Sequence, residues 1–150
     1  MIIAVDFDGT VVEHAYPKIG KPIPFALDVL RKLQEERHTL LLWTVREGDL
    51  LEEALEYCAK NGVNFYAANM NFPNEEGGAA PRKLAADVFI DDKNIGGLPD
   101  WGLIYSAIKS GSLYFSDIDD YYSESNMPKK KKNLFTRLGE SWDTAQRYKR

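Results

Sequence analysis

The sequence is poor in cysteine and in long apolar runs, and both absences limit what the chain can be. Among 150 residues there is one cysteine, Cys58, so no internal disulfide can form. Cys58 occupies an apolar position of a helical pattern, which favours a buried structural thiol over a nucleophile. No stretch reaches the roughly 20 apolar residues that span a bilayer, and the chain opens on a core strand rather than a signal peptide. We therefore expect a cytoplasmic protein without a membrane span.

Positive charge is scarce over most of the chain. Residues 1–127 carry 11 Lys and Arg against 21 Asp and Glu, whereas residues 128–150 carry 8 against 2. The acidic body argues against nucleic-acid binding, for which only the basic end would be suited.

Residues 116–150 differ in kind from the rest. A polar, acidic stretch leads to Lys129–Lys132, after which apolar side chains return at roughly helical spacing, namely Leu134, Phe135, Leu138 and Trp142. This pattern predicts a helix that docks on its own domain or on a twin subunit, and the second case would make the protein a homo-oligomer. The alternative is a tail that binds nucleic acid or a membrane surface. We divide the chain into a folded domain at 1–115 and an extension at 116–150.

Strand and helix patterns alternate along residues 2–115. Apolar runs predict strands at 2–5, 39–44, 63–66 and 87–92, with a short edge strand at 113–115. Amphipathic spacing predicts helices that begin at Pro22, at Asp49 with a capping box to Glu52, and at Trp101. This order predicts an α/β, doubly wound, Rossmann-like three-layer sandwich with a parallel sheet.

The first strand ends in two carboxylates, in the segment Asp6-Phe7-Asp8-Gly9-Thr10. Alternation along the strand would place Asp6 and Asp8 on one side, at the carboxyl edge where α/β folds bind ligands. Two adjacent carboxylates repel each other, and a divalent metal that also binds a phosphate would relieve that repulsion. The alternative is a strand that ends in an Asp-Gly turn with solvated acids.

Three further strand ends present polar side chains. These are Thr44 with Arg46, Asn69 with Asn71, and Asp91 with Asp92. Because the ends of parallel strands meet at one edge, we expect these groups to converge. With Lys83, which precedes the fourth strand, they would form a phosphoryl-transfer site.

Together these segments resemble the motifs of the haloacid dehalogenase (HAD) superfamily of phosphatases and phosphotransferases. Asp6–Thr10 looks like its first motif and Thr44 like its second, while Lys83 matches the third and Asp91-Asp92 the fourth. The motifs stand in the family's order over about residues 1–110. Lys83 is followed by leucine where many relatives have proline, so either Arg82 or Lys83 could supply the active-site cation.

The resemblance implies a catalytic role for each matching residue. Asp6 would form an aspartyl-phosphate, and Asp8 would protonate the leaving group and then activate water. Thr44 and the amides near Gly9 would hold phosphate oxygens, and Lys83 would screen their charge. Members that cleave carbon–halogen bonds lack the acid at Asp8, so the chain resembles the phosphate-ester enzymes.

The resemblance also implies a Mg²⁺ site. Its ligands would be Asp6, the Asp8 carbonyl and Asp91, with Asp92 either a ligand through water or a neighbour of the ligands.

The spacing of the motifs leaves no room for the cap domains that the family inserts over its substrate. About 34 residues separate the first motif from Thr44, and 38 separate Thr44 from Lys83. An open site would suit a bulky substrate, or a small one closed in by a neighbouring subunit. The candidate substrate-binding residues are Gly9, Thr10, His14, Arg46 and Asn69.

Two of these candidates have a structural alternative. Arg46 could contact the remote end of the substrate or pair with Glu47 or Asp49 at the surface. His14, in a flap at 10–21, could be an ordinary surface residue.

The sequence thus predicts a Mg²⁺-dependent phosphate monoesterase that acts on a small phosphorylated metabolite or a phosphorylated macromolecule. One alternative is a non-catalytic HAD-like domain that keeps the metal and binds a partner. Another is a nucleic-acid end phosphatase, which the acidic body opposes.

Overall fold

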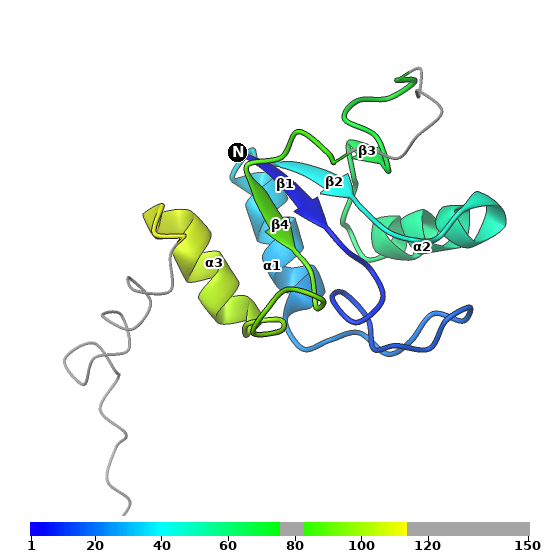
Figure 1. The fold of residues 1–150 in the computed structure, drawn as a ribbon, viewed down its shortest axis with the longest axis horizontal. Coiled ribbons are helices and arrows are strands. Elements are labelled where there is room, and N and C mark those ends of the chain that lie inside the picture. Colours follow the sequence, from blue (N-terminus) through cyan, green and yellow to red (C-terminus); the bar gives the residue numbers. More distant parts are fainter. Residues whose placement is uncertain (76–82, 114–150) are drawn as a thin grey trace, which may run out of the picture. The chain divides into compact units, whose positions relative to one another are not determined.

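The computed structural model describes residues 1–75 and 83–113, and these form a parallel α/β fold (Figure 1). Four strands pair in the order β3-β2-β1-β4, and every pairing is parallel. The strands are β1 (Ile2–Val5), β2 (Thr39–Leu42), β3 (Ala67–Ala68) and β4 (Val88–Ile90). The helices are α1 (Ala26–Glu35), α2 (Gly48–Lys60) and α3 (Trp101–Ser110). The predicted fold class, α/β with a parallel sheet, is confirmed.

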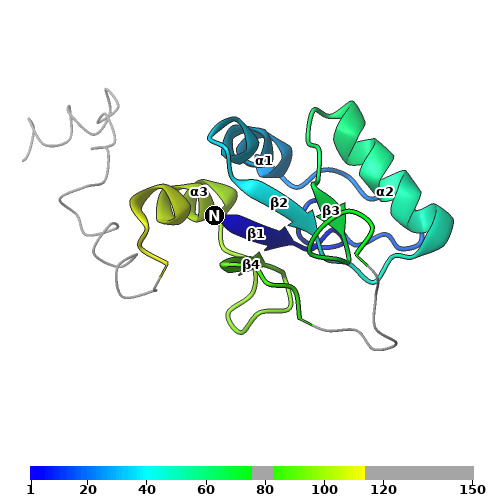
Figure 2. The same cartoon turned by 90° about the horizontal axis from the view of Figure 1, so that it is seen from above.

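The main core lies between the sheet and the three helices. Alternate strand residues such as Ile3 and Leu40 point into it, and each helix adds the apolar stripe that its sequence period predicts. In α1 that stripe consists of Ala26, Val29, Leu30 and Leu33. Figure 2 shows α1 and α2 on the same side of the sheet.

The second face of the sheet is covered differently. Ala4 and Leu41 are buried there with Ala67 and Leu84, and partly buried side chains such as Phe89 pack around them. Leu84 belongs to the crossover from β3 to β4, which is non-helical wherever the structure describes it. The helical layer that a three-layer sandwich would place on this face is not among the described residues.

The third strand lies later than predicted. Residues 63–66 are not a strand, and the pairing with β2 is made by Ala67 and Ala68. Val63 is buried and Phe65 is partly buried in the main core, between the sheet and the helices. Their apolar side chains therefore reflect packing in that core rather than membership of a strand. Backbone hydrogen bonding to β2 begins at Tyr66, whose N–H donates to the Leu40 carbonyl at 2.8 Å.

Two predicted helix starts are wrong by a few residues. The first helix begins at Ala26 rather than at Pro22, after Phe25 in a left-handed conformation. In α2 the N-cap is Glu47 and makes no side-chain cap hydrogen bond, so the capping box predicted at Asp49 does not form. Asp49 lies instead in the first turn, where the helix dipole favours a negative charge.

No cap domain interrupts the chain between the first two motifs. From Thr10 to Thr44 it forms the flap, α1 and β2, and all of these residues are described. None of the helices in the described ranges combines the length and the apolar character that a bilayer crossing demands.

The predictions for the C-terminal extension fall outside the described residues. These are the domain boundary at 115/116, the basic run Lys129–Lys132, and the apolar stripe of Leu134, Phe135, Leu138 and Trp142. Of the short strand predicted at 113–115, only Leu113 is described, and it is not in a strand.

Candidate active site

Three carboxylates meet at the carboxyl edge of the sheet. Asp6 follows β1, Asp91 and Asp92 follow the adjacent β4, and each offers an oxygen such that the three atoms lie within 4.8 Å of one another. The parallel register causes this meeting, because Val5 lies opposite Ile90 and the Asp6 N–H donates to the Ile90 carbonyl at 2.9 Å. Acids that lie far apart in the sequence therefore form one cluster.

A divalent cation fits this cluster. The Asp92 Oδ1 atom is buried and accepts no hydrogen bond, which is costly for a carboxylate oxygen unless something else binds it. Burial, together with repulsion from Asp91 and Asp92, raises the pKa of Asp6 to about 6. A hard cation would satisfy the orphaned oxygen and relieve the repulsion at the same time.

Thr10 fixes the geometry of this acid cluster rather than binding a substrate. Its side chain is 0% exposed, and its hydroxyl donates to Asp6 Oδ2 at 3.0 Å and accepts from the Asp92 N–H at 3.1 Å. The Trp101 indole N–H donates to the Thr10 carbonyl at 3.1 Å. The substrate-binding role predicted for Thr10 is therefore wrong, because nothing of the residue faces solvent.

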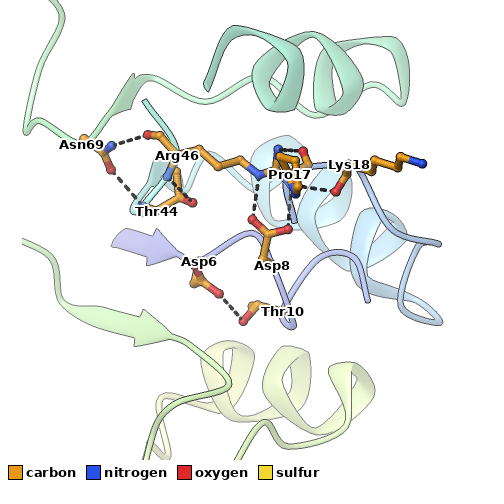
Figure 3. A network of polar contacts seen from close by, with 8 residues as sticks. All are labelled: Asp6, Asp8, Thr10, Pro17, Lys18, Thr44, Arg46 and Asn69. Atoms are coloured by element: carbon orange, nitrogen blue, oxygen red, sulfur yellow. Dashed lines mark hydrogen bonds and ion pairs between the residues drawn. The ribbon is translucent and has the colours of Figure 1, made fainter. Parts of the chain in front are cut away.

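Asp8 does not join the acid cluster but pairs with Arg46 (Figure 3). Arg46 Nε donates to Asp8 Oδ2 and Arg46 Nη2 to Asp8 Oδ1, both at 2.7 Å. The two side chains are 0% and 8% exposed. The hydrogen bonds from Arg46 to Asp8 outweigh burial and raise the pKa of Arg46. Both carboxylate oxygens of Asp8 are thus occupied by a buried cation.

The same guanidinium ties the flap to the sheet. Two of its three remaining N–H groups donate to the carbonyls of Pro17 and Lys18 at 2.9 and 3.0 Å, and the guanidinium carbon lies 5.1 and 5.4 Å from the ring centres of Phe7 and Tyr16. Both roles predicted for Arg46, a substrate contact and a surface ion pair, are wrong, because the side chain is wholly buried.

Asn69 supports the fold, and Thr44 follows β2 at the edge of the sheet where Asp6 follows β1. Asn69 Oδ1 accepts from the Thr44 N–H at 2.9 Å, and its amide donates to the Arg46 carbonyl at 3.3 Å. The side chain thus holds the loop after β2 in place, and the substrate contact predicted for Asn69 stays a prediction. The half-buried Thr44 accepts from the Arg46 N–H at 3.3 Å, which leaves its own hydroxyl hydrogen available to a phosphate.

Gly9 lets His14 and Asp92 approach its backbone closely, and its amide is not available to bind phosphate. Its N–H donates to the Val12 carbonyl at 2.7 Å, so that amide is already used within the turn. The residue has a φ of +96° and lies directly beneath His14 and Asp92. The predicted substrate contact through the Gly9 amide is thus not supported by its geometry.

Two basic side chains, Lys93 and His14, contact the acid cluster and each other, since Lys93 Nζ lies 3.0 Å from His14 Nε2. Lys93 Nζ lies 2.5 Å from Asp92 Oδ2, and His14 Nε2 lies 2.9 Å from the same oxygen. Burial alone would raise the pKa of Asp92, but these hydrogen bonds outweigh it and lower that pKa. His14 is exposed and contacts Asp92, and its predicted contact with a substrate stays a prediction. Sequence reasoning missed Lys93, although it directly follows Asp91-Asp92.

Lys83 lies elsewhere in the described structure. It is exposed, and its Nζ lies 4.7 Å from the centre of the Phe89 ring, on the second face of the sheet. Arg82, the other candidate for the active-site cation, is outside the described residues. The described lysine in contact with the acids is Lys93.

Known proteins place the chain in a family without naming an activity. No protein-family model matches it, and no curated protein does. A solved structure of a conserved protein from Bacteroides thetaiotaomicron is 58% identical, with a TM-score of 0.75, and the match covers 83% of this chain and 98% of that one. The chain belongs to the family of that conserved protein. The relative is described only as conserved, so this membership supports the fold but assigns no reaction.

A second solved structure is only weakly similar. It is a D,D-heptose 1.7-bisphosphate phosphatase from B. bronchiseptica complexed with magnesium and phosphate, 20% identical over 55% of each chain, with a TM-score of 0.39. Similarity this low carries no argument about this chain.

Proposed function

We propose that the protein is a HAD-like, Mg²⁺-dependent phosphohydrolase that transfers a phosphoryl group to Asp6 and then to water. The observation that supports this most is the meeting of Asp6, Asp91 and Asp92 within 4.8 Å, with a buried oxygen of Asp92 left unpartnered. A carboxylate cluster at the carboxyl edge of a parallel sheet suits a metal that also binds phosphate.

Asp6, Asp91 and Asp92 would hold the metal. Bound there, Mg²⁺ would neutralise charge on the phosphoryl oxygens and so lower the barrier to attack by an anion. The same cation would keep Asp6 ionised at neutral pH, although burial raises the pKa of Asp6 to about 6 without metal.

Asp6 would act as the nucleophile, and its neighbours would orient it. The Thr10 hydroxyl, 3.0 Å from Asp6 Oδ2, fixes the rotation of the carboxylate. Thr44, at the end of β2, would donate to a phosphate oxygen. Lys93, which contacts both Asp92 and His14, would add positive charge at the rim, the role that the resemblance assigned to Lys83.

Turnover of an aryl phosphate by the full-length protein, with and without divalent metal, tests this function. Mg²⁺ should support turnover and EDTA should abolish it. Ca²⁺ should not replace Mg²⁺, because calcium takes longer bonds and more ligands. Asp6→Asn should remove activity while the exposed Asp49→Asn, a matched acid-to-amide control, should keep it.

Titration of the metal-free protein with Mg²⁺ separates the alternatives. Asp91→Asn should weaken Mg²⁺ binding by about 10-fold or more, since a ligand is lost. Mg²⁺ binding without turnover of any phosphate would indicate a non-catalytic metal-binding domain. Turnover that survives both EDTA and Asp6→Asn would reject the site altogether.

A further inference from the structure

His14 connects the flap to the acid cluster. Its Nε2 atom lies 2.9 Å from Asp92 Oδ2, and because an ionised carboxylate can only accept hydrogen bonds, the imidazole is the donor. Lys93 Nζ lies 2.5 Å from the same oxygen. The other oxygen of that carboxylate, Asp92 Oδ1, is buried and has no hydrogen-bond partner among the described residues. Asp92 is therefore held through one oxygen, and its second oxygen is left for another ligand.

The space above Gly9 shows that the position of His14 is built into the fold. Exposed contacts between opposite charges usually contribute little, and the His14 side chain is 54% exposed. Here, however, a Cβ atom on Gly9 would stand 2.3 Å from His14 Nε2. The imidazole thus occupies a place that exists because residue 9 has no side chain.

The backbone that carries His14 is anchored on both sides of it. Just before His14, the Glu13 N–H donates to the Lys21 carbonyl at 2.8 Å and closes the base of the flap. Just after it, the buried Arg46 donates to the Pro17 carbonyl at 2.9 Å (Figure 3). The imidazole reaches Asp92 from backbone that is already ordered, which lowers the entropic cost of the contact.

We propose that His14 is a positioning residue of the metal site, which holds Asp92 Oδ2 so that Oδ1 stays available to the metal and thereby couples the flap to metal binding. This rests on the proposed function, because it needs the metal that Asp6, Asp91 and Asp92 would hold. Side chains that orient a metal ligand in this way typically contribute about 10- to 100-fold to metal affinity.

The coupling acts in both directions. If the contact between His14 and Asp92 strengthens metal binding, bound metal must strengthen that contact by the same factor. The flap should therefore open less often when the site is loaded, although none of its residues is a proposed ligand.

Calorimetric titration of the full-length protein with Mg²⁺ tests the proposal. His14→Ala should weaken Mg²⁺ binding by about 10-fold or more. His14→Gln keeps an N–H donor without a charge, and it should stay within about threefold of the wild type. His38→Ala is the matched control, because that histidine lies 3.2 Å from the N-terminal amine of Met1, at the start of β1.

Lys93 is less suited to this test, although it contacts the same oxygen. Its charge would repel a bound cation while its hydrogen bond orients Asp92, so removal of the side chain has two opposing effects on Mg²⁺ affinity.

Hydrogen exchange of the flap amides gives an independent readout. Mg²⁺ should slow exchange of the Glu13 amide in the wild type by about the factor that His14→Ala loses in affinity. In His14→Ala itself, Mg²⁺ should leave that exchange unchanged. Slowing of the same size in both proteins would contradict the coupling.

The titrations also separate this inference from the proposed function. If the wild type binds Mg²⁺ and Asp91→Asn weakens binding, but His14→Ala binds as tightly as His38→Ala, only this inference fails. Equal losses in His14→Ala and His14→Gln would show that the hydrogen bond is not the cause and would overturn it too. If the wild type binds no Mg²⁺, the proposed function fails as well.

Discussion

Gly9 and Asp92 lie so close together that a Cβ atom built on Gly9 would stand 2.7 Å from Asp92 Oδ2. The same atom would lie 2.3 Å from His14 Nε2. Any side chain at position 9 must therefore displace Asp92, a member of the acid cluster, and His14, which contacts it. Glycine is therefore required at position 9 for two reasons: it leaves space for His14 and Asp92, and it adopts a φ of +96° without strain.

Gly9→Ala should weaken Mg²⁺ binding by about 10- to 100-fold, because it shifts Asp92 away from Asp6 and Asp91. Gly96→Ala is the matched control, since Gly96 has a φ of +94° and nothing within 4 Å of the added atom. Both variants should lose about 1 kcal/mol or more of stability from backbone strain. Calorimetric titration with Mg²⁺ checks this, and equal losses of affinity in the two variants would contradict it.

Thr10→Val should loosen the acid cluster with little change in shape. The substitution removes the hydroxyl that donates to Asp6 and accepts from the Asp92 N–H, so a part-buried acceptor and a part-buried donor each lose a partner. We expect a loss of about 1–3 kcal/mol in the free energy of unfolding, measured in urea without metal. Thr10→Ser keeps the hydroxyl and should retain most of that stability.

Arg46→Met should cost about 3–5 kcal/mol, because it leaves Asp8 as a buried carboxylate without its partner. The double variant Asp8→Asn/Arg46→Met should recover part of that loss, since no charge then remains uncompensated. Arg46→Lys should not rescue the site, because an ammonium cannot make the two-armed contact. Strictly additive effects in urea unfolding would contradict the coupling of these two residues.

The acid cluster could be anticipated because it depends on topology alone. Parallel strands that end together bring Asp6 beside Asp91, and the alternating strand and helix patterns were enough to predict a parallel sheet. The third strand was predicted too early in the chain because Val63 and Phe65 are apolar. Their side chains pack in the main core, and a short apolar run of this kind looks the same in sequence whether or not its backbone pairs in a strand.

The role of Arg46 could not be predicted from its sequence neighbours. Arginine is almost never fully buried unless it is paired, and its partners here lie in the segment that follows β1 and on the flap, far from it in the chain. The contact depends on how the irregular flap folds back over the sheet edge, and no periodic pattern encodes that. Lys93, in contrast, directly follows Asp91-Asp92, and this adjacency was a usable signal.

Cys58 should be unreactive toward thiol reagents in the native protein. Burial raises the pKa of its thiol to about 12, as expected for the structural cysteine that the sequence predicted. At pH 8 almost no thiolate exists, and the sulfur is shielded from solvent. Mass spectrometry after alkylation should show label only when the chain is unfolded in guanidinium, and rapid labelling of the native protein would contradict the packing.

Removal of the metal should make the stability of the protein depend on the protonation of Asp6. Burial raises the pKa of Asp6 from 3.8 to about 6 in the folded chain without metal. As the pH rises from about 4 to 6, the unfolded chain loses this proton first, so the metal-free folded state loses stability over that range. Below pH 3.8 both states are protonated and the effect is absent.

Asp6→Asn isolates this contribution because the amide carries no charge at any of these pH values. In EDTA the variant should be more stable than the wild type at pH 7.5 but not at pH 4, whereas the exposed Asp49→Asn should show no such pH-dependent gain. Saturating Mg²⁺ should reverse the order at pH 7.5, since the cation stabilises the ionised wild-type cluster and binds the variant poorly. Urea unfolding under the three conditions measures these differences. The same difference in EDTA at pH 4 and pH 7.5 would show that Asp6 does not keep its proton in the metal-free fold.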